Sequence, residues 1–312
     1  MNDFHHRPVM AERIVEVFTP VPPGVFVDAT VGGGGHARLV LEARPDLSFV
    51  GIDRDPEALE AAARTLAPFG DRVQLRHARF DALEVVMADL HVPKASGVLF
   101  DLGVSSPQLD RGRRGFSYRY DGPLDMRMDP GDRWSASDVV NGYPEVELVR
   151  VLQDYGEERF AIRIAAAIVA NRPIETTAQL ASIVRDAIPA PARRRGGHPA
   201  KRTFQAIRIE VNRELEILPA AIDAAIDATA PGGRVAVLSY HSGEDRIVKE
   251  RFRHAVTGGC TCPPGLPCVC DAVQTVRLVR PGAWKPTAAE VAANPRAESA
   301  RLRVVEKLTT NS

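Results

Sequence analysis

A run of glycines near the start of the chain constrains the fold more than any other sequence feature. Residues 25–27 are β-branched or aromatic and predict a buried strand, which Asp28 follows. Four consecutive glycines, Gly32 to Gly35, come next, and a segment with helical spacing begins at Ala37. Strand, glycine turn and helix open the βαβ unit of nucleotide-binding sheets, where the chain turns tightly and a ligand approaches bare backbone. The alternative interpretation is a tight turn without a ligand.

Asp28 bears on which ligand this turn would bind. The pattern Gly32-x-Gly34-x-x-Ala37, with Asp53 about 20 residues further on, also fits a dinucleotide site. Both a nicotinamide or flavin dinucleotide and S-adenosylmethionine are therefore open. A carboxylate at the end of the first strand would repel a pyrophosphate on the helix N-terminus, but it suits a ligand with an ammonium and a sulfonium group. These charges favour S-adenosylmethionine.

The strand pattern then repeats and places further acids at strand ends. Three more buried strands are predicted, at 47–53, 73–77 and 96–103. Asp28, Asp53 and Asp101 follow the apolar parts of three of the four strands. Because ligands of open α/β sheets bind at the carboxyl ends of the strands, three acids at one edge predict a binding site there.

Two side chains near this edge have a predicted role in binding the ligand. Asp53 is placed to accept hydrogen bonds from ribose hydroxyls, while the alternative is a helix cap, a role that Asp55 could fill instead. Phe80 follows the third strand and could flank an adenine ring, although core packing explains it equally well.

The α/β alternation stops after residue 105 and returns after residue 216. Between them lie an irregular segment rich in Arg, Gly, Asp and Pro and a series of segments with helical periodicity. A long helix is predicted at 205–229, then a strand from 234 and a closing antiparallel pair at 276–280 and 301–308. We therefore expect a discontinuous α/β domain, residues 1–105 and 217–312, with an inserted all-helical domain at 106–216.

Two basic segments of this insertion are typical of a nucleic-acid surface. Residues 193–202 carry Arg, His and Lys, and no acid occurs between Asp186 and Glu210. Residues 111–120 interleave arginines with aromatic side chains. The alternative is a solvated loop. The candidate RNA contacts are Arg114, Phe116, Lys201 and Arg202.

Charge and hydropathy limit the kinds of partner and the cellular compartment that we expect for the protein. The 40 basic and 40 acidic residues cancel, so any nucleic-acid surface must be local. The start of the sequence has no apolar signal core and no run of 18 apolar residues follows, so we expect a soluble cytoplasmic protein without a membrane partner.

All four cysteines fall in one short segment, at Cys260, Cys262, Cys268 and Cys270. This clustering is not that of a secreted disulfide scaffold. A structural zinc site and a metal-free thiol loop remain equally open, and a disulfide is less favoured.

Longer motifs across most of the chain resemble one family, the bacterial 16S rRNA cytosine-N4 methyltransferases known as MraW or RsmH. The matching segments include Gly34-Gly35-His36 and Asn294-Pro295-Arg296-Ala297. The others are residues 6–10, 51–56, 101–108, 114–117, 121–128, 155–160, 198–200, 203–206, 241–242 and 244–249. The sequence departs from the family pattern at Gly33, Tyr240 and Gly243.

The resemblance implies a Rossmann-like class I methyltransferase sheet that uses S-adenosylmethionine to methylate N4 of a cytosine in the decoding region of 16S rRNA. It implies donor contacts from Gly34, Gly35, His36, Asp53, Phe80, Asp101 and Gln108. The partner would be 16S rRNA or the small ribosomal subunit, and a homodimer remains open.

The exocyclic amine of cytosine is a poor nucleophile, so the site must orient it and accept its hydrogen bonds. The candidates for this catalytic role are Asp101, Ser105 and Ser106, because carboxylate and hydroxyl oxygens accept such bonds. Two other functions stay open on sequence alone: a nicotinamide-dependent oxidoreductase and a ribosome-assembly factor without catalysis.

Overall fold

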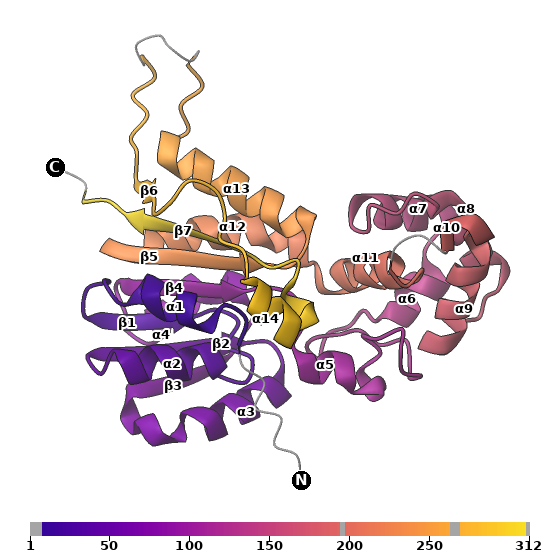
Figure 1. Cartoon of the computed structure of the whole chain (residues 1–312), viewed down its shortest axis with the longest axis horizontal. Coiled ribbons are helices and arrows are strands. Elements are labelled where there is room, and N and C mark those ends of the chain that lie inside the picture. The colour runs from indigo at the N-terminus through magenta and orange to yellow at the C-terminus, as the bar shows by residue number, and fades with distance from the viewer. Residues whose placement is uncertain (1–7, 194–196, 263–268, 310–312) are drawn as a thin grey trace. The chain divides into compact units, whose positions relative to one another are not determined.

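The computed structural model describes residues 8–193, 197–262 and 269–309, except for the side chains of Ser106 and Pro107 (Figure 1). The chain divides into two compact units. Unit 1 comprises Met1–Gly103 and Ile217–Ser312, and unit 2 comprises Val104–Glu216.

Unit 1 is built on one seven-stranded sheet with the order β3-β2-β1-β4-β5-β7-β6. Strands β1 to β5 pair in parallel, while β7 runs antiparallel to both β5 and β6. The strands are β1 (Gly24–Asp28), β2 (Leu47–Asp53), β3 (Val73–His77), β4 (Ala95–Asp101), β5 (Thr229–Ser239), β6 (Val276–Leu278) and β7 (Arg301–Lys307). This arrangement confirms the expected Rossmann-like α/β sheet and its closing antiparallel pair.

Helices cover both faces of this sheet because successive strand residues point to opposite sides. Phe26 and Phe49, paired across β1 and β2, pack against α1 (Ala11–Phe18), α2 (Gly35–Ala43) and α3 (Pro56–Leu66). Their neighbours Val27 and Val50 face the other core, which takes in side chains of α4 (Leu83–Asp89), α12 (Glu214–Ala228) and α13 (Ser242–Thr257). The last helix of the unit is α14 (Ala288–Ala293).

Unit 2 has its own apolar core, which includes Leu148, Ile164, Leu180 and Ile207. Its helices are α5 (Ser106–Asp110), α6 (Ala136–Gly142), α7 (Glu145–Asp154), α8 (Ala161–Ala170), α9 (Thr177–Ala187), α10 (Ala190–Arg193) and α11 (Lys201–Asn212). None of the helices within the described ranges is long and apolar enough to cross a membrane.

The prediction of a single long helix at 205–229 is wrong, because the structure has two helices there. Arg213 adopts a left-handed backbone with φ 54°, which ends α11 and lets α12 begin at Glu214. The buried side chain of Asn212 accepts a hydrogen bond from the Met128 amide at 2.9 Å and donates one to the Met126 carbonyl at 2.8 Å. These contacts fix the end of α11 against a segment distant in sequence.

Candidate active site at the carboxyl edge of the sheet

Three acidic side chains meet at the carboxyl edge of the sheet in unit 1. β1 ends at Asp28, which is in register with Gly51 of β2 and Leu99 of β4. Asp53 and Asp101 therefore extend two residues beyond Asp28, one on each side. β1 and β4 also flank the point at which the strand order reverses, where sheets of this type form a ligand crevice.

The glycine turn between β1 and α2 places bare backbone next to these acids. Gly34 caps α2 with φ 78°, and a Cβ there would lie 3.2 Å from Leu66, so position and conformation both require glycine. A Cβ on Gly35 would lie 2.6 Å from Pro8. A Cβ on Gly33, by contrast, would meet no atom within 4 Å. The open side of the turn is thus at Gly33, where a larger side chain would also fit.

Asp53 is tied to the turn by its carboxylate. Its Oδ2 accepts a hydrogen bond from the Gly32 amide at 2.8 Å, and its Oδ1 accepts one from the Asp55 amide at 2.9 Å. Burial raises the pKa of Asp53 to about 6, although these backbone hydrogen bonds oppose the shift. Asp55 caps α3 by accepting a hydrogen bond from the Glu57 amide at 3.1 Å. The helix cap is therefore Asp55 and not Asp53. The role of Asp53 toward a ribose stays a prediction.

Asp28 is the most buried of the three acids, with 1% of its surface exposed. Burial raises the pKa of Asp28 to about 7. The charge of His36 and the hydrogen bond from the Thr30 amide lower this pKa, while the negative charges of Asp101 and Asp53 raise it further. Its Oδ1 accepts from the Thr30 amide at 3.0 Å. Asp28 is therefore poised to hold or release a proton near neutral pH.

Asp101 is oriented by two side chains. Tyr240 donates its hydroxyl proton to Oδ1 at 2.7 Å, and Nδ1 of His36 lies 3.4 Å from Oδ2. Nε2 of His36 lies 2.9 Å from the carbonyl oxygen of Val9. Because both ring nitrogens face acceptors, the geometry suits a doubly protonated imidazolium.

The pKa of His36 follows from the same contacts. Burial alone would lower it, but the hydrogen bond and charge of Asp101, with the Val9 carbonyl, raise it above 6.5. The side chain of Asp101 remains 28% exposed, so it can still accept a hydrogen bond from a ligand or a substrate.

Two of these links escaped the sequence analysis. Thr30 accepts a hydrogen bond from the Asp101 amide at 2.6 Å on its Oγ1, joining the ends of β1 and β4. A threonine two residues after a strand-end Asp is a recognisable turn signal that could have identified it. Tyr240 stood out in the sequence as a departure from the family pattern, but no local signal indicated its contact with Asp101.

Of the other predicted site residues, Phe80 lies in unit 1, while Ser105, Ser106 and Gln108 lie in unit 2. Phe80 is half-buried, and its ring packs edge-on against Phe100 with centroids 5.9 Å apart. In unit 2, the buried Gln108 accepts a hydrogen bond from the Ser105 amide at 2.9 Å. The side chain of Ser106 lies outside the described residues, so its catalytic role remains a prediction.

Arg114 and Phe116, two of the candidate RNA contacts, lie inside unit 2. Their exposed fractions are only 8% and 5%, so both side chains are largely buried, and their contact with RNA stays a prediction. Arg114 donates to the carbonyls of Arg127 and Met128 at 3.1 and 2.9 Å, and its guanidinium lies 5.8 Å from the Phe116 ring centroid. Both side chains hold the irregular segment together.

Lys201 and Arg202, by contrast, are exposed in the first turn of α11. Nearby in sequence, the ring of His198 stacks on that of Tyr118, with centroids 4.2 Å apart and planes 15° apart. The guanidinium of Arg119 lies 5.9 Å from the same Tyr118 ring. The two basic segments singled out in the sequence therefore meet in unit 2.

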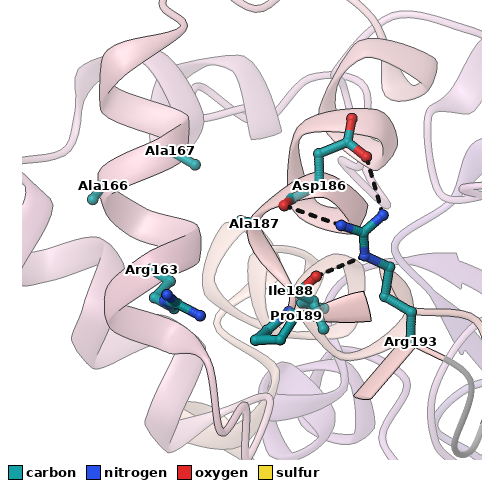
Figure 2. A pocket seen from close by; sticks show the side chains of 8 residues that line it. All are labelled: Arg163, Ala166, Ala167, Asp186, Ala187, Ile188, Pro189 and Arg193. Carbon is teal, nitrogen blue, oxygen red and sulfur yellow. Dashed lines mark hydrogen bonds and ion pairs between the residues drawn. The ribbon is translucent and has the colours of Figure 1, made fainter. Parts of the chain in front are cut away.

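A pocket of about 420 Å³ in the same unit is lined by residues of α8 and α9 and by the segment from Ala187 to Arg193 (Figure 2). Arg193 donates to the Ile188 carbonyl at 2.6 Å and lies 3.6 Å from the Asp186 carboxylate. Arg163 reaches the pocket from α8, opposite this pair in Figure 2. Arg193 is thus already engaged by Asp186 and a backbone carbonyl, and the pocket adds no established ligand site.

Comparisons with known proteins identify a family that matches almost the whole chain. The family described as the MraW methylase family matches residues 3–308 of the chain. Three of the similar curated proteins illustrate the match, and each is named ribosomal RNA small subunit methyltransferase H. The protein of Thermobifida fusca is 53% identical, and the match covers 97% of this chain and 93% of that protein. The protein of Acidothermus cellulolyticus is 54% identical, and the match covers 97% of this chain and 94% of that protein. The one from Heliobacterium modesticaldum is 51% identical over 98% of this chain and 99% of its own.

Proposed function

This chain belongs to the MraW methylase family, and from that membership we propose that it is an S-adenosylmethionine-dependent methyltransferase of small-subunit ribosomal RNA. Its target is the exocyclic N4 of a cytosine in the decoding region of 16S rRNA. The relatives' shared name supports the RNA substrate. The structural observation that carries the proposal is the group of three acids at the carboxyl edge of the sheet.

The residues at this edge fit S-adenosylmethionine. Its sulfonium and ammonium groups are cationic, and Asp28, Asp53 and Asp101 place three carboxyl groups where the strand order reverses. A bound cation favours the ionised forms of these carboxyl groups. Asp53 keeps lone pairs for the ribose hydroxyls, and Gly33 leaves space beside bare backbone. When bound, S-adenosylmethionine supplies an electrophilic methyl group on positively charged sulfur.

The protein's own contribution to the chemistry is orientation and proton acceptance. The lone pair of the cytosine amine is delocalised into the ring, so the nitrogen reacts only when it is held in line and its protons are accepted. Positioning of this kind can supply about 7–11 kcal/mol of the barrier. Asp101 can accept an amine proton, because Tyr240 and His36 fix its carboxylate while 28% of the side chain stays exposed. Ser105 and Ser106, shortly after it in sequence, are proposed to help position the amine.

The cysteine distribution favours N4 over ring carbon 5. Methylation at carbon 5 of a pyrimidine uses a thiol nucleophile within reach of the ring. All four cysteines lie between residues 260 and 270, and none falls in the glycine turn or the motif that begins at Asp101. An exocyclic amine needs no covalent intermediate.

Unit 2 is proposed to recognise the RNA. Lys201 and Arg202 offer exposed charge for phosphates, and the stacked Tyr118 and His198 offer aromatic faces close to Arg119. The enzyme would act in the cytoplasm, and a homodimer stays a prediction that light scattering on the purified chain can test.

The deciding experiment is product identification. Naked 16S rRNA and small ribosomal subunits are incubated with the purified chain and isotope-labelled S-adenosylmethionine, then digested to nucleosides for mass spectrometry. N4-methylcytidine is the expected product, and Asp101→Asn should lose methyl transfer while it remains folded. Recovery of 5-methylcytidine, or of a protein–RNA thioether adduct, would overturn the proposal.

A further inference from the structure

Three thiol groups converge in the segment that links α13 to β6 in unit 1. The sulfur atoms of Cys260, Cys262 and Cys270 all lie within 4.8 Å of one another. Cys260 and Cys262 are half-buried and Cys270 is exposed. Cys268 lies outside the described residues, so the inference rests on the other three.

The backbone holds the two arms of this segment together at their base (Figure 1). Gly258 ends α13 with φ 61°, and the backbone of Val273 fills the space that a Cβ on Gly258 would need. The Thr275 amide donates to the Ala255 carbonyl at 3.3 Å, and the Cys260 amide donates to the Thr257 carbonyl at 3.1 Å. One arm therefore presents Cys260 and Cys262, and the other arm presents Cys270, from a common anchor on α13.

Apolar packing does little to hold the outer part of these arms. Val269, next to Cys270, is 85% exposed, and even Val273 at the base of the arm is 63% exposed. A long connection that buries so little apolar surface needs another cross-link to keep one conformation. The converging thiols are placed to provide it.

We propose that Cys260, Cys262 and Cys270 bind one thiophilic divalent cation, zinc by its preference for thiolate ligands, as a structural cross-link between the two arms. With metal–sulfur bonds of about 2.3 Å, sulfur atoms in a tetrahedral site lie about 3.8 Å apart. Separations below 4.8 Å thus need only a small closing movement. Each thiol gives up its proton to the solvent as its bond to the metal forms, and no oxidation takes place.

A disulfide is the competing use of the same thiols. It would join two of the three sulfur atoms at about 2.05 Å and leave the third outside the bond. Magnesium and calcium do not fit, because they take oxygen ligands. The cross-link does not depend on the proposed methyl transfer, so either proposal can fail without the other.

The test measures metal in the full-length chain. The protein is produced with zinc in the medium, purified in deoxygenated buffer without added thiol, desalted and analysed by mass spectrometry for metal content and for disulfides. We expect about one zinc per chain. Cobalt(II) in its place should give the intense near-ultraviolet absorption of thiolate-to-cobalt charge transfer, a readout independent of activity.

Matched variants assign the ligands. Cys260→Ser combined with Cys270→Ser should lose nearly all bound metal and the cobalt absorption, whereas Thr261→Ala, between two of the thiols, should keep both. Should the double variant fail to fold, the wild-type cobalt spectrum alone decides. The proposal is overturned if the wild-type chain retains no metal and shows no thiolate absorption, if the double variant retains as much as wild type, or if a metal-free disulfide joins two of the three cysteines.

Discussion

Nδ1 of His36 lies 3.4 Å from Oδ2 of Asp101, while the opposite ring nitrogen faces the Val9 carbonyl at 2.9 Å. A neutral imidazole carries only one N–H group and could not donate to both acceptors. When His36 is protonated, the pair places a buried positive charge between the first residues of α2 and the end of β4. That charge keeps the Asp101 carboxylate oriented at the edge where the donor is proposed to bind.

The first prediction concerns this charge and the stability of the fold. The folded-state pKa of His36 is raised above 6.5, so its contribution is fully present below 6.5 and is lost as the pH rises through the raised value. His36→Gln should lower the free energy of unfolding by about 1.5–3 kcal/mol at a pH below 6.5, the value of a hydrogen bond to a charged group. Urea unfolding of the wild type and the variant should show a smaller difference in the free energy of unfolding at strongly alkaline pH. An equal difference at both pH values would show that His36 is not an imidazolium in the folded protein.

A second prediction links donor binding to proton release. The pKa of Asp28 is raised to about 7 and that of Asp53 to about 6, chiefly by burial, so both carboxyls are partly protonated near those values. A cationic donor favours their ionised forms, and its affinity should therefore rise as the pH increases through this range.

Calorimetry in two buffers of different ionisation enthalpy measures the protons released. Asp28→Asn keeps an oxygen for the Thr30 amide but cannot ionise, so it should release fewer protons than wild type. A binding enthalpy that is the same in both buffers near neutral pH would show that neither acid responds to the donor.

The sheet edge was predictable because its signals are local. Asp28, Asp53 and Asp101 each end or follow an apolar run, and the run itself defines the strand. Parallel pairing then brings the strand ends together without further information. The resemblance to the family added the identity of the donor, which periodicity and spacing alone left open.

Features set by distant contacts were not predictable. The break at Arg213 depends on the side chain of Asn212, which bonds to the backbone of Met126 and Met128. Arg114 lies in an arginine-rich segment typical of a surface, yet backbone carbonyls far along the chain bind its guanidinium in the interior. Neither contact leaves a periodic pattern in the sequence.

The third prediction tests the ribose contact assigned to Asp53. Asp53→Ala should weaken S-adenosylmethionine binding by about 1.5–3 kcal/mol, or about 10- to 150-fold, because hydrogen bonds to a charged group are lost. Asp46→Ala is a matched control, since Asp46 immediately precedes the other end of β2 and pairs with Arg44. Titration calorimetry on folded variants measures both affinities. Unchanged donor affinity in the Asp53 variant would remove this residue from the site.

The last prediction concerns the exposed start of α11. Lys201→Ala combined with Arg202→Ala should weaken binding to 16S rRNA. The slope of log affinity against log salt concentration should become shallower by about 1.4–1.8, because each lost phosphate contact removes about 0.7–0.9. Donor affinity should not change, since these side chains are assigned to RNA alone. Lys249→Ala with Arg253→Ala removes the same two charges from the exposed surface of α13 and should leave the slope as in wild type. Filter binding at several salt concentrations measures the slope. If the control pair matches the α11 pair, the effect is one of total charge, and if donor affinity falls as far as RNA affinity, unit 2 is not a separate RNA-recognition domain.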